Sequence, residues 1–353
     1  MNCCIKCFES AYLKSIIGTS NHIGTCDYCK TKRVNLYNIS NLTYFGNILS
    51  LYVIDTERGK PIEEQLILDF PKEFLSQHLI EAKAVKQLIL DIVDNIIEEE
   101  KEDYKDILNS PVQLKYKKNN DNKTTNEELS LSWEKFTKEI KTINRFHLTN
   151  KPDLEKLRTL FGYYEHNILK GKKYFRARIS DKKGFPKKYM GNPPSLLTKS
   201  GRANPEGISY LYLANNIETT LFEVRAGLKD FVSVGTFKLK ENITVVNLNS
   251  YDVFRLAESE LLEDAILHQS FIDKLDEELS KPRRRSDSEL DYLPTQYLSE
   301  LIKSMGCDGI EFRSSLNPEG YNLAIFNPDK FICTNVKVYD VDEIKLVAIP
   351  YKQ

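Results

Sequence analysis

The most chemically suggestive side chains of this sequence lie between residues 171 and 248. Arg176 and Arg178 belong to one short apolar stretch (YFRAR), and Tyr212 belongs to a second (YLYLA). Glu223 follows in a third segment (TTLFEVR). Guanidinium groups bind phosphates, an aromatic ring stacks on a base, and a carboxylate stabilises a sugar that becomes oxocarbenium-like. These residue types suit the cleavage of a dinucleotide at a sugar–base bond.

The two arginines are separated by a single residue. A strand at this position would therefore direct Arg176 and Arg178 to the same face of a sheet. Two positive groups on one face are unfavourable unless anions lie nearby, and a pyrophosphate would supply them through bidentate contacts. Salt bridges to acidic side chains of the protein are the alternative that these residues leave open.

The segments around the arginines offer further candidate ligand contacts. Gly201–Gly207 (GRANPEG) is rich in residues that permit a close approach of the backbone to a ligand. Arg202 in this segment could reach a phosphate or a ribose, although a plain connecting loop has the same composition. Tyr212 could equally be a packing residue of a strand. Glu223 is expected in the first turns of a helix, where a surface pair with Arg225 is the alternative.

The order of five segments resembles that of the RES domain, a family of bacterial toxins related in fold to the ADP-ribosyltransferases and named for its Arg, Glu and Ser. The segments are YFRAR, GRANPEG, YLYLA, TTLFEVR and DGIEFRSSL. The resemblance extends from about residue 171 to about residue 339, roughly half of the chain. It implies an ADP-ribosyltransferase-like mixed β-sheet domain that consumes NAD.

The resemblance also implies roles for single residues. It places the family's arginine at Arg176, which would bind the pyrophosphate, and the family's tyrosine at Tyr212, which would contact the nicotinamide ribose. Glu223 would act on the reacting sugar. Arg178 and Arg202 are further candidates for contacts with the dinucleotide.

The family's serine corresponds to Ser314, with Ser315 as the neighbour that could take its place. No histidine is placed by sequence to activate this hydroxyl, so it is expected to bind a phosphate or ribose oxygen rather than to attack. Arg313 stands where the resemblance leads us to expect a proline. Gln296 is a further residue expected to line the cleft.

The reaction that the resemblance implies is cleavage of the nicotinamide–ribose bond of NAD, by hydrolysis or phosphorolysis. Transfer of ADP-ribose to a protein is the alternative within the same family. The expected biology is growth arrest through NAD loss, as a toxin or phage-defence effector. An antitoxin, an activating partner or a second copy of the chain would be its partner. A non-catalytic nucleotide sensor and an RNA-binding protein are the alternatives from other classes.

The cysteines near the start of the chain have the spacing of a metal site. Cys4, Cys7, Cys26 and Cys29 form the pattern C-x2-C-x18-C-x2-C. Each pair brings two thiolates to one side of a tight turn, and two pairs complete a tetrahedral zinc site. Four cysteines leave no coordination position open, so the predicted zinc is structural. Cys3 could replace Cys4, and four unrelated buried thiols are the alternative.

The chain is expected to contain three regions: a zinc ribbon at 1–45, a mainly helical domain at 46–170 and the RES domain at 171–353. Apolar residues recur at about 3.6-residue spacing in three segments, as helices require. These segments are 74–96, 131–143 and 154–164. The helical domain resembles HEPN-type regions that precede some RES domains. It lacks their Arg-x4–6-His motif, so we expect a scaffolding or sensing role.

After residue 171 the pattern changes to short β-like runs interrupted by helical segments. The expected strands are 174–179, 210–214, 231–238, 244–248, 309–313, 321–326 and 334–339. The expected helices are 217–226, 253–279 and 294–305. Strands scattered between helices, without regular βαβ alternation, predict an α+β fold.

The composition excludes several classes of protein. The 353 residues are 41% hydrophobic and 29% charged, with a net charge of −1, as in ordinary globular proteins. The near-zero net charge gives no positive field that would attract nucleic acid or an anionic membrane. The sequence contains no run of about 18 apolar residues, so no membrane-spanning helix is predicted. The sequence contains neither a GxGxxG nor a Walker-type motif, so a Rossmann or P-loop nucleotide site is not predicted. The cysteine spacing favours a reducing compartment and predicts a cytoplasmic location.

Overall fold

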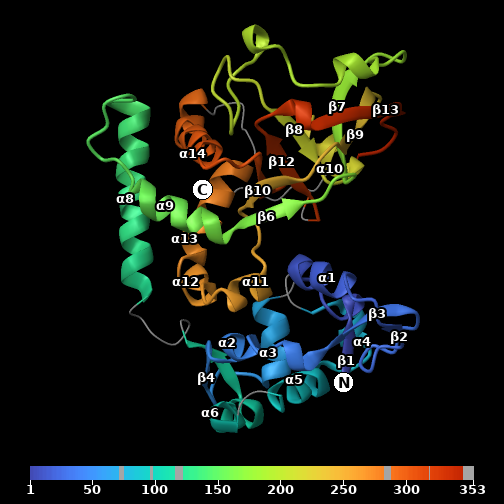
Figure 1. Ribbon diagram of the computed structural model, residues 1–353. Coiled ribbons are helices and arrows are strands. Elements are labelled where there is room, and N and C mark those ends of the chain that lie inside the picture. The colour runs from blue at the N-terminus through green and yellow to red at the C-terminus, as the bar shows by residue number, and fades with distance from the viewer. Residues whose placement is uncertain (71–74, 96–97, 116–121, 282–287, 318, 345–353) are drawn as a thin grey trace. The chain divides into compact units, whose positions relative to one another are not determined.

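The computed structural model describes residues 1–70, 75–95, 98–115, 122–281, 288–317 and 319–344. The backbone separates into two compact units, shown together in Figure 1. The first contains residues 1–131 and 250–271, and the second contains residues 132–249 and 272–353. The domain boundaries expected at residues 45 and 170 stay a prediction.

An eight-stranded sheet organises the second unit, in the order β13-β9-β7-β8-β12-β11-β10-β6. The strands are β6 (Glu165–Ile168), β7 (Lys173–Ser180), β8 (Leu211–Ala214), β9 (Phe231–Leu239), β10 (Ile243–Asn247), β11 (Gly309–Arg313), β12 (Tyr321–Ile325) and β13 (Phe331–Asp340). Only β10 and β11 pair in parallel among these neighbours. All seven strands expected from the apolar runs are present, and the mixed sheet confirms the α+β fold class.

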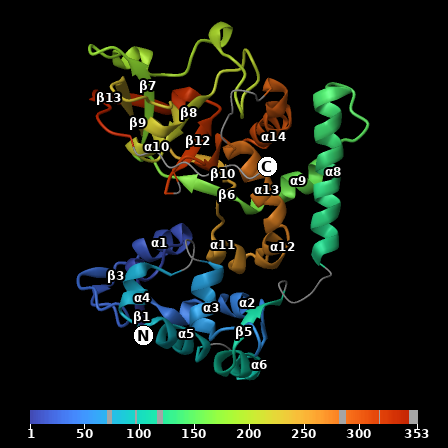
Figure 2. The same cartoon turned by 180° about the vertical axis from the view of Figure 1, so that it is seen from behind.

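Helices pack around this sheet. They are α8 (Asn122–Thr142, in this unit from Ser132), α9 (Leu154–Tyr163), α10 (Ile217–Glu223), α13 (Gln269–Ser280, in this unit from Ile272) and α14 (Leu293–Ser304). Helix α14 packs against β11, and α10 packs against β7. Figures 1 and 2 both show α13 and α14 on the same side of the sheet. The predicted helix at 253–279 is three separate helices, of which α13 is the last.

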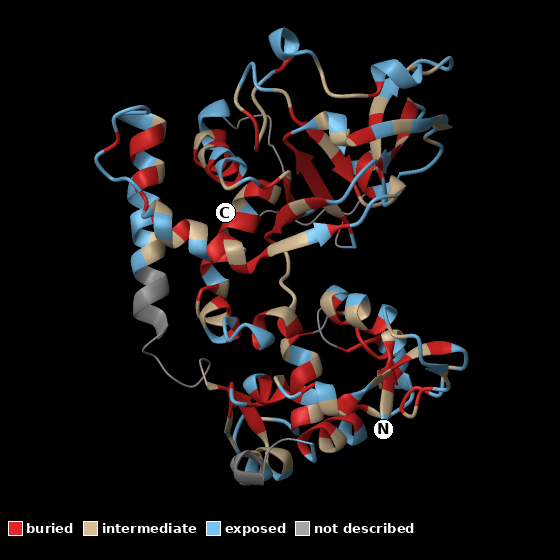
Figure 3. Ribbon diagram, viewed as in Figure 1, coloured by how far each residue is buried: buried red, intermediate tan, exposed pale blue. Residues whose placement is uncertain are grey.

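The core of the second unit explains why the alternating runs form this sheet. One cluster joins buried side chains of several strands, including Tyr174, Leu213, Phe237, Leu323 and Phe331. The central strands are accordingly buried over most of their length, as Figure 3 shows in red. A smaller cluster on β7 and β9 receives the apolar side of α10. That packing fixes the helix that carries the proposed carboxylate.

Glu311 is a charged residue type placed in the middle of this sheet. It is 6% exposed, and burial raises the pKa of its carboxyl to about 8, partly opposed by the charge of Lys172. A folded-state pKa above the ordinary value of 4.5 means that the folded protein holds the proton more tightly than the unfolded chain. The protonated Glu311 carboxyl therefore contributes fully to the free energy of unfolding at low pH. This contribution is lost as the carboxyl ionises while the pH rises toward about 8.

Glu311→Gln is expected to remove this pH dependence, because glutamine keeps the shape of the acid but cannot ionise. At pH 8 the variant should exceed the wild type in free energy of unfolding by on the order of a few kcal/mol, and at pH 4.5 by little. Urea unfolding of both proteins across this pH range measures the difference. Parallel stability curves would show that Glu311 ionises normally in the folded protein.

The first unit contains two small sheets and several helices. The strands are β1 (Asn2–Cys4), β2 (Ile23–Gly24) and β3 (Val34–Asn38) in one sheet, and β4 (Tyr52–Ile54) and β5 (Val112–Leu114) in the other. The helices are α1 (Ala11–Gly18), α2 (Phe45–Leu49), α3 (Ile62–Asp69), α4 (Gln77–Glu81), α5 (Val85–Val93), α6 (Glu98–Asn109), α11 (Val253–Glu258) and α12 (Leu262–Leu267).

The apolar periodicity expected at 74–96 corresponds to two helices, α4 and α5. Lys83 lies between them with φ of 52°, in the left-handed region that interrupts a helix. Residues 74 and 96, where the pattern begins and ends, lie outside the described residues. Across the parts of the chain that the structure describes, none of the helices combines the length and apolar character of a membrane span.

Candidate functional site

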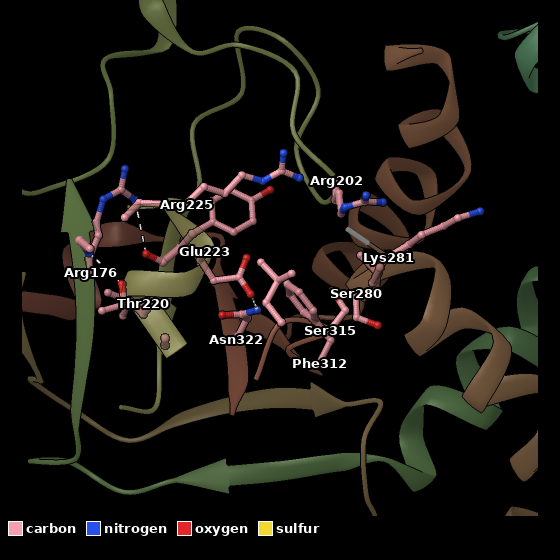
Figure 4. Close-up of a pocket in the computed structure, with 17 residues that line it drawn as sticks. Arg176, Arg202, Thr220, Glu223, Arg225, Ser280, Lys281, Phe312, Ser315 and Asn322 are labelled. Carbon is pink, nitrogen blue, oxygen red and sulfur yellow. Dashed lines mark hydrogen bonds between the residues drawn. The ribbon is translucent and has the colours of Figure 1, made fainter. Parts of the chain in front are cut away.

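A cavity of about 560 Å³ lies in the second unit, beside the middle of β7 and at the ends of β8 and α10. The loop that contains Arg202, the end of α13 and the segment after β11 complete its wall. Figure 4 shows its lining, whose charged and long polar side chains are Arg176, Arg202, Glu223, Arg225, Lys281 and Asn322. The cavity is thus lined by several cations and one carboxylate.

Local structure fixes Glu223 at the end of α10. The side chain of Asn216 caps the helix by accepting a hydrogen bond from the backbone N–H of Thr219 at 2.7 Å. The hydroxyl of Thr220 accepts one from the backbone N–H of Ala177 on β7 at 2.8 Å. The helix is therefore attached to the sheet, and its last residue points its carboxylate at the cavity (Figure 4).

Two donors hold the Glu223 carboxylate in one orientation. The Ser314 hydroxyl donates to Oε1 at 2.8 Å, and the Asn322 side-chain amide donates to the same oxygen at 2.7 Å. Within the described residues the second oxygen, Oε2, has no donor. One oxygen is thus used for positioning, and the other is available to a bound molecule.

Arg176 lies on β7 and lines the cavity. Its Nη1 lies 3.4 Å from the carbonyl oxygen of Tyr212, and its Nε is buried with no partner among the described residues. Burial, helped by the neighbouring charge of Arg178, lowers the pKa of Arg176 to about 10, so it is charged at neutral pH. No carboxylate of the described residues forms an ion pair with it. A half-buried cation that no carboxylate neutralises favours a bound anion.

Arg178 lies outside the lining of the cavity. Its guanidinium donates to the carbonyl oxygen of Tyr189 and lies 4.3 Å from the ring centroid of Phe185. The two arginines share a strand face, as their spacing predicts, but the structure brings only Arg176 to the cavity.

Tyr212 and Gln296 hold the loop that carries Arg202. The Tyr212 hydroxyl donates to Asn204 Oδ1 at 2.8 Å and accepts from the backbone N–H of Ala203 at 3.1 Å. Buried Gln296 donates to the backbone oxygens of Gly201 and Asn204 at 2.8 and 3.0 Å. The Tyr212 ring lines the cavity, whereas its hydroxyl is used within the protein.

The same loop requires glycine at position 201. A Cβ there would lie 2.4 Å from Asn204 Oδ1 and 3.0 Å from the Tyr212 hydroxyl. This close packing places Arg202 at the cavity edge, over the ring of Tyr292. Gln296, expected to line the cleft, instead lies behind the loop and supports it.

The two serines at the end of β11 have different surroundings. Ser314 is 4% exposed and its hydroxyl contacts Glu223. Ser315 is exposed and contributes to the cavity lining. The geometry gives Ser314 a positioning contact, and Ser315 is the serine that faces the cavity.

The polar lining residues Arg225, Lys281 and Asn322 were not among the predicted site residues. Asn322 is a buried polar residue in the otherwise apolar strand YNLAI, which is a signal for a specific hydrogen bond. Arg225 has φ of 52° directly after the C-cap of α10, where glycine is usual. Such a conformation costs a side-chain-bearing residue about 1–2 kcal/mol.

The four cysteines of the predicted ribbon lie together in the first unit. Cys4, Cys7, Cys26 and Cys29 are buried, and their Sγ atoms all lie within 4.8 Å of one another. The shortest separations are 3.5 Å, close to the roughly 3.8 Å between sulfurs that bind one tetrahedral zinc at about 2.3 Å. Cys3 is outside the cluster and donates to the carbonyl of Tyr37. The four thiols therefore fit a metal ion, with Cys4 rather than Cys3 as the first ligand.

Comparisons with known proteins concern mainly the part of the chain that contains this cavity. Residues 173–344 match the family model of the RES domain, so this part of the chain is a RES domain. A search of curated proteins found no match. Among solved structures the chain is similar to a chain of the M. tuberculosis MbcT–MbcA toxin–antitoxin complex. That similarity has 14% identity and a TM-score of 0.32, and it covers 53% of this chain and 93% of the other.

Proposed function

We propose that the cavity of the RES domain binds NAD and cleaves the bond between nicotinamide and ribose. The observation that carries this proposal is the arrangement of Glu223. Its carboxylate is held through Oε1 and offers Oε2 to a cavity that also contains the guanidinium of Arg176, whose Nε lacks a partner among the described residues. A fixed negative charge beside a phosphate-binding cation suits a reaction in which a sugar becomes positively charged.

Cleavage breaks the bond between ribose C1′ and nicotinamide N1, and the bonding electron pair leaves with nicotinamide. Positive charge then develops on C1′ and the ring oxygen of the ribose. The carboxylate of Glu223 stabilises that charge, and an oxygen nucleophile forms the new bond to C1′. Water yields ADP-ribose and a proton, phosphate yields a phosphorylated ADP-ribose, and a protein side chain yields an ADP-ribosylated protein.

The cations of the cavity suit the charge of a dinucleotide. Arg176 is assigned to the pyrophosphate, because its half-buried guanidinium has an unpaired Nε and can bind two phosphate oxygens. Arg225, Arg202 and Lys281 provide further positive charge along the wall. The ring of Tyr212 is assigned to the nicotinamide end, where an aromatic face can stack on a flat heterocycle.

Purified full-length protein incubated with NAD tests this function and identifies the acceptor. Products are resolved by chromatography with phosphate, without phosphate, and with candidate protein acceptors. We expect free nicotinamide in at least one condition, and its partner product names the acceptor. NAD that binds but stays intact in every condition would favour a nucleotide sensor instead.

The wider role follows from the RES domain. We infer that the chain acts as a toxin or phage-defence effector that arrests growth by removing NAD, and that an antitoxin or activating partner controls it. Zinc at the four cysteines would have a structural role in the first unit, since a closed Cys4 site leaves no position for a substrate. The helices between residues 46 and 170 are assigned a scaffolding or sensing role.

Arg176→Lys is expected to weaken NAD binding by about tenfold, although the positive charge is retained. Lysine offers a point charge where a planar guanidinium can bind two phosphate oxygens, and its ammonium is more costly to bury. Titration calorimetry with NAD measures the change. Arg178→Lys is the matched control on the same strand and should bind as the wild type does. Equal affinity of Arg176→Lys and wild type would assign Arg176 a structural role.

A further inference from the structure

Asp276 is a buried carboxylate on α13 that does not line the cavity. Its side chain is 3% exposed and forms an ion pair with Nε of Arg313 at 2.5 Å. Its Oδ1 also accepts a hydrogen bond from the backbone N–H of Arg313 at 3.0 Å. Asp276 therefore fixes both the backbone and the side chain of one residue at the end of β11.

That residue directly precedes the serine that holds the Glu223 carboxylate. Ser314 donates from its hydroxyl to Glu223 Oε1 at 2.8 Å, and its backbone N–H donates to the carbonyl of Gly320 at 2.9 Å. The backbone is therefore held at Arg313 and at Ser314 itself. The position of the Ser314 hydroxyl thus depends on the backbone at residue 313.

We propose that Asp276 and Arg313 are positioning residues for the Glu223 carboxylate, an inference that rests on the proposed NAD cleavage. Asp276 is buried but the Arg313 side chain is 48% exposed, and an ion pair with one partner in water adds little to stability. A pair that also holds a backbone N–H one residue from Ser314 instead restricts where that hydroxyl can lie. The contacts Asp276–Arg313 and Ser314–Glu223 thereby connect α13 to the reacting group.

Position 313 is where the resemblance to the RES domain leads us to expect a proline. Proline at position 313 would have a fixed φ but neither an N–H nor a side chain that binds Asp276. Arginine provides both contacts.

Asp276→Asn in the full-length protein tests the proposal, because asparagine keeps the shape and an acceptor oxygen but removes the charge. We expect kcat for NAD cleavage to fall by about 10-fold or more, with KM changed by less than about twofold, as for a displaced reacting group. Lys274→Gln is the matched control, since Lys274 is on the same helix and pairs with Glu134 at 2.8 Å. Its kcat should equal that of the wild type.

Arg313→Gln is a second variant for the case in which Asp276→Asn folds poorly, because it removes the ion pair and keeps the backbone N–H. It should also lower kcat, and the double variant should lose less than the product of the two single effects. Wild-type kcat in folded Asp276→Asn or Arg313→Gln protein would overturn the proposal and leave the pair a purely structural role.

Hydrogen exchange without NAD separates failure of this proposal from failure of the proposed function. The peptide covering residues 310–317 should exchange faster in Asp276→Asn than in Lys274→Gln or wild type. If the wild type does not cleave NAD, the proposed function fails, and this exchange alone then decides whether Asp276 orders the segment. Unchanged exchange in Asp276→Asn would contradict the positioning role.

Discussion

Glu223→Gln is expected to slow the loss of NAD by about 100-fold or more while changing NAD affinity little. Glutamine keeps the shape of the side chain, and its amide oxygen can still accept from Ser314 and Asn322. It removes the negative charge that stabilises the oxocarbenium-like sugar, an interaction made mainly in the transition state. Single-turnover rates and calorimetry on the same preparations separate the chemical step from binding.

Glu218→Gln provides the matched control for this variant. Glu218 is an exposed acid in the first turn of the same helix, and it does not line the cavity. It should retain the wild-type rate. If NAD loss causes growth arrest, expression of Glu223→Gln should be tolerated while expression of Glu218→Gln arrests growth. A Glu223→Gln protein that consumes NAD at the wild-type rate would remove the catalytic assignment.

Cys26→Ser is expected to lose the bound zinc and with it the ordered structure of the sheet formed by β1, β2 and β3. Zinc binding by four thiolates contributes on the order of 10 kcal/mol to the folding of small zinc modules, which exceeds the stability of most small domains. Elemental analysis of protein purified without chelator should give about one zinc per wild-type chain. Hydrogen exchange over residues 1–41 should rise sharply in the variant.

Cys3→Ser is the control for the loss of a buried thiol next to the cluster. The serine hydroxyl of this variant can still donate to the carbonyl of Tyr37, and the four proposed ligands are intact. Zinc content and exchange should therefore stay at the wild-type level. Wild-type protein without zinc, or Cys26→Ser protein with full zinc content, would contradict the metal site.

The strands of the sheet could be predicted because their apolar residues are consecutive or alternate within short runs. Helix ends were harder to predict, since they depend on single backbone conformations. The segment 253–279 has helical periodicity throughout, but Glu260 adopts a left-handed conformation with φ of 59° and separates α11 from α12. The periodicity of the apolar residues does not predict that interruption.

The candidate site was predictable where one strand or helix carries the residue, and not where the fold brings segments together. Arg176, Tyr212 and Glu223 lie in short motifs and reach one cavity. Asn322 follows Glu223 by 99 residues and contacts it only because β12 pairs with β8. Arg178 lies on the same face of β7 as Arg176 but contacts the carbonyl oxygen of Tyr189. The alternation of side chains along a strand does not predict this contact.

The release of nicotinamide from NAD labelled in its nicotinamide ring tests the central claim most directly. Wild type and Glu223→Gln are compared at equal concentrations of folded protein, in buffers with and without phosphate. The account predicts free labelled nicotinamide with the wild type and a rate lower by about 100-fold or more with the variant. Equal rates for the two proteins, or intact NAD with the wild type in every buffer, would contradict it.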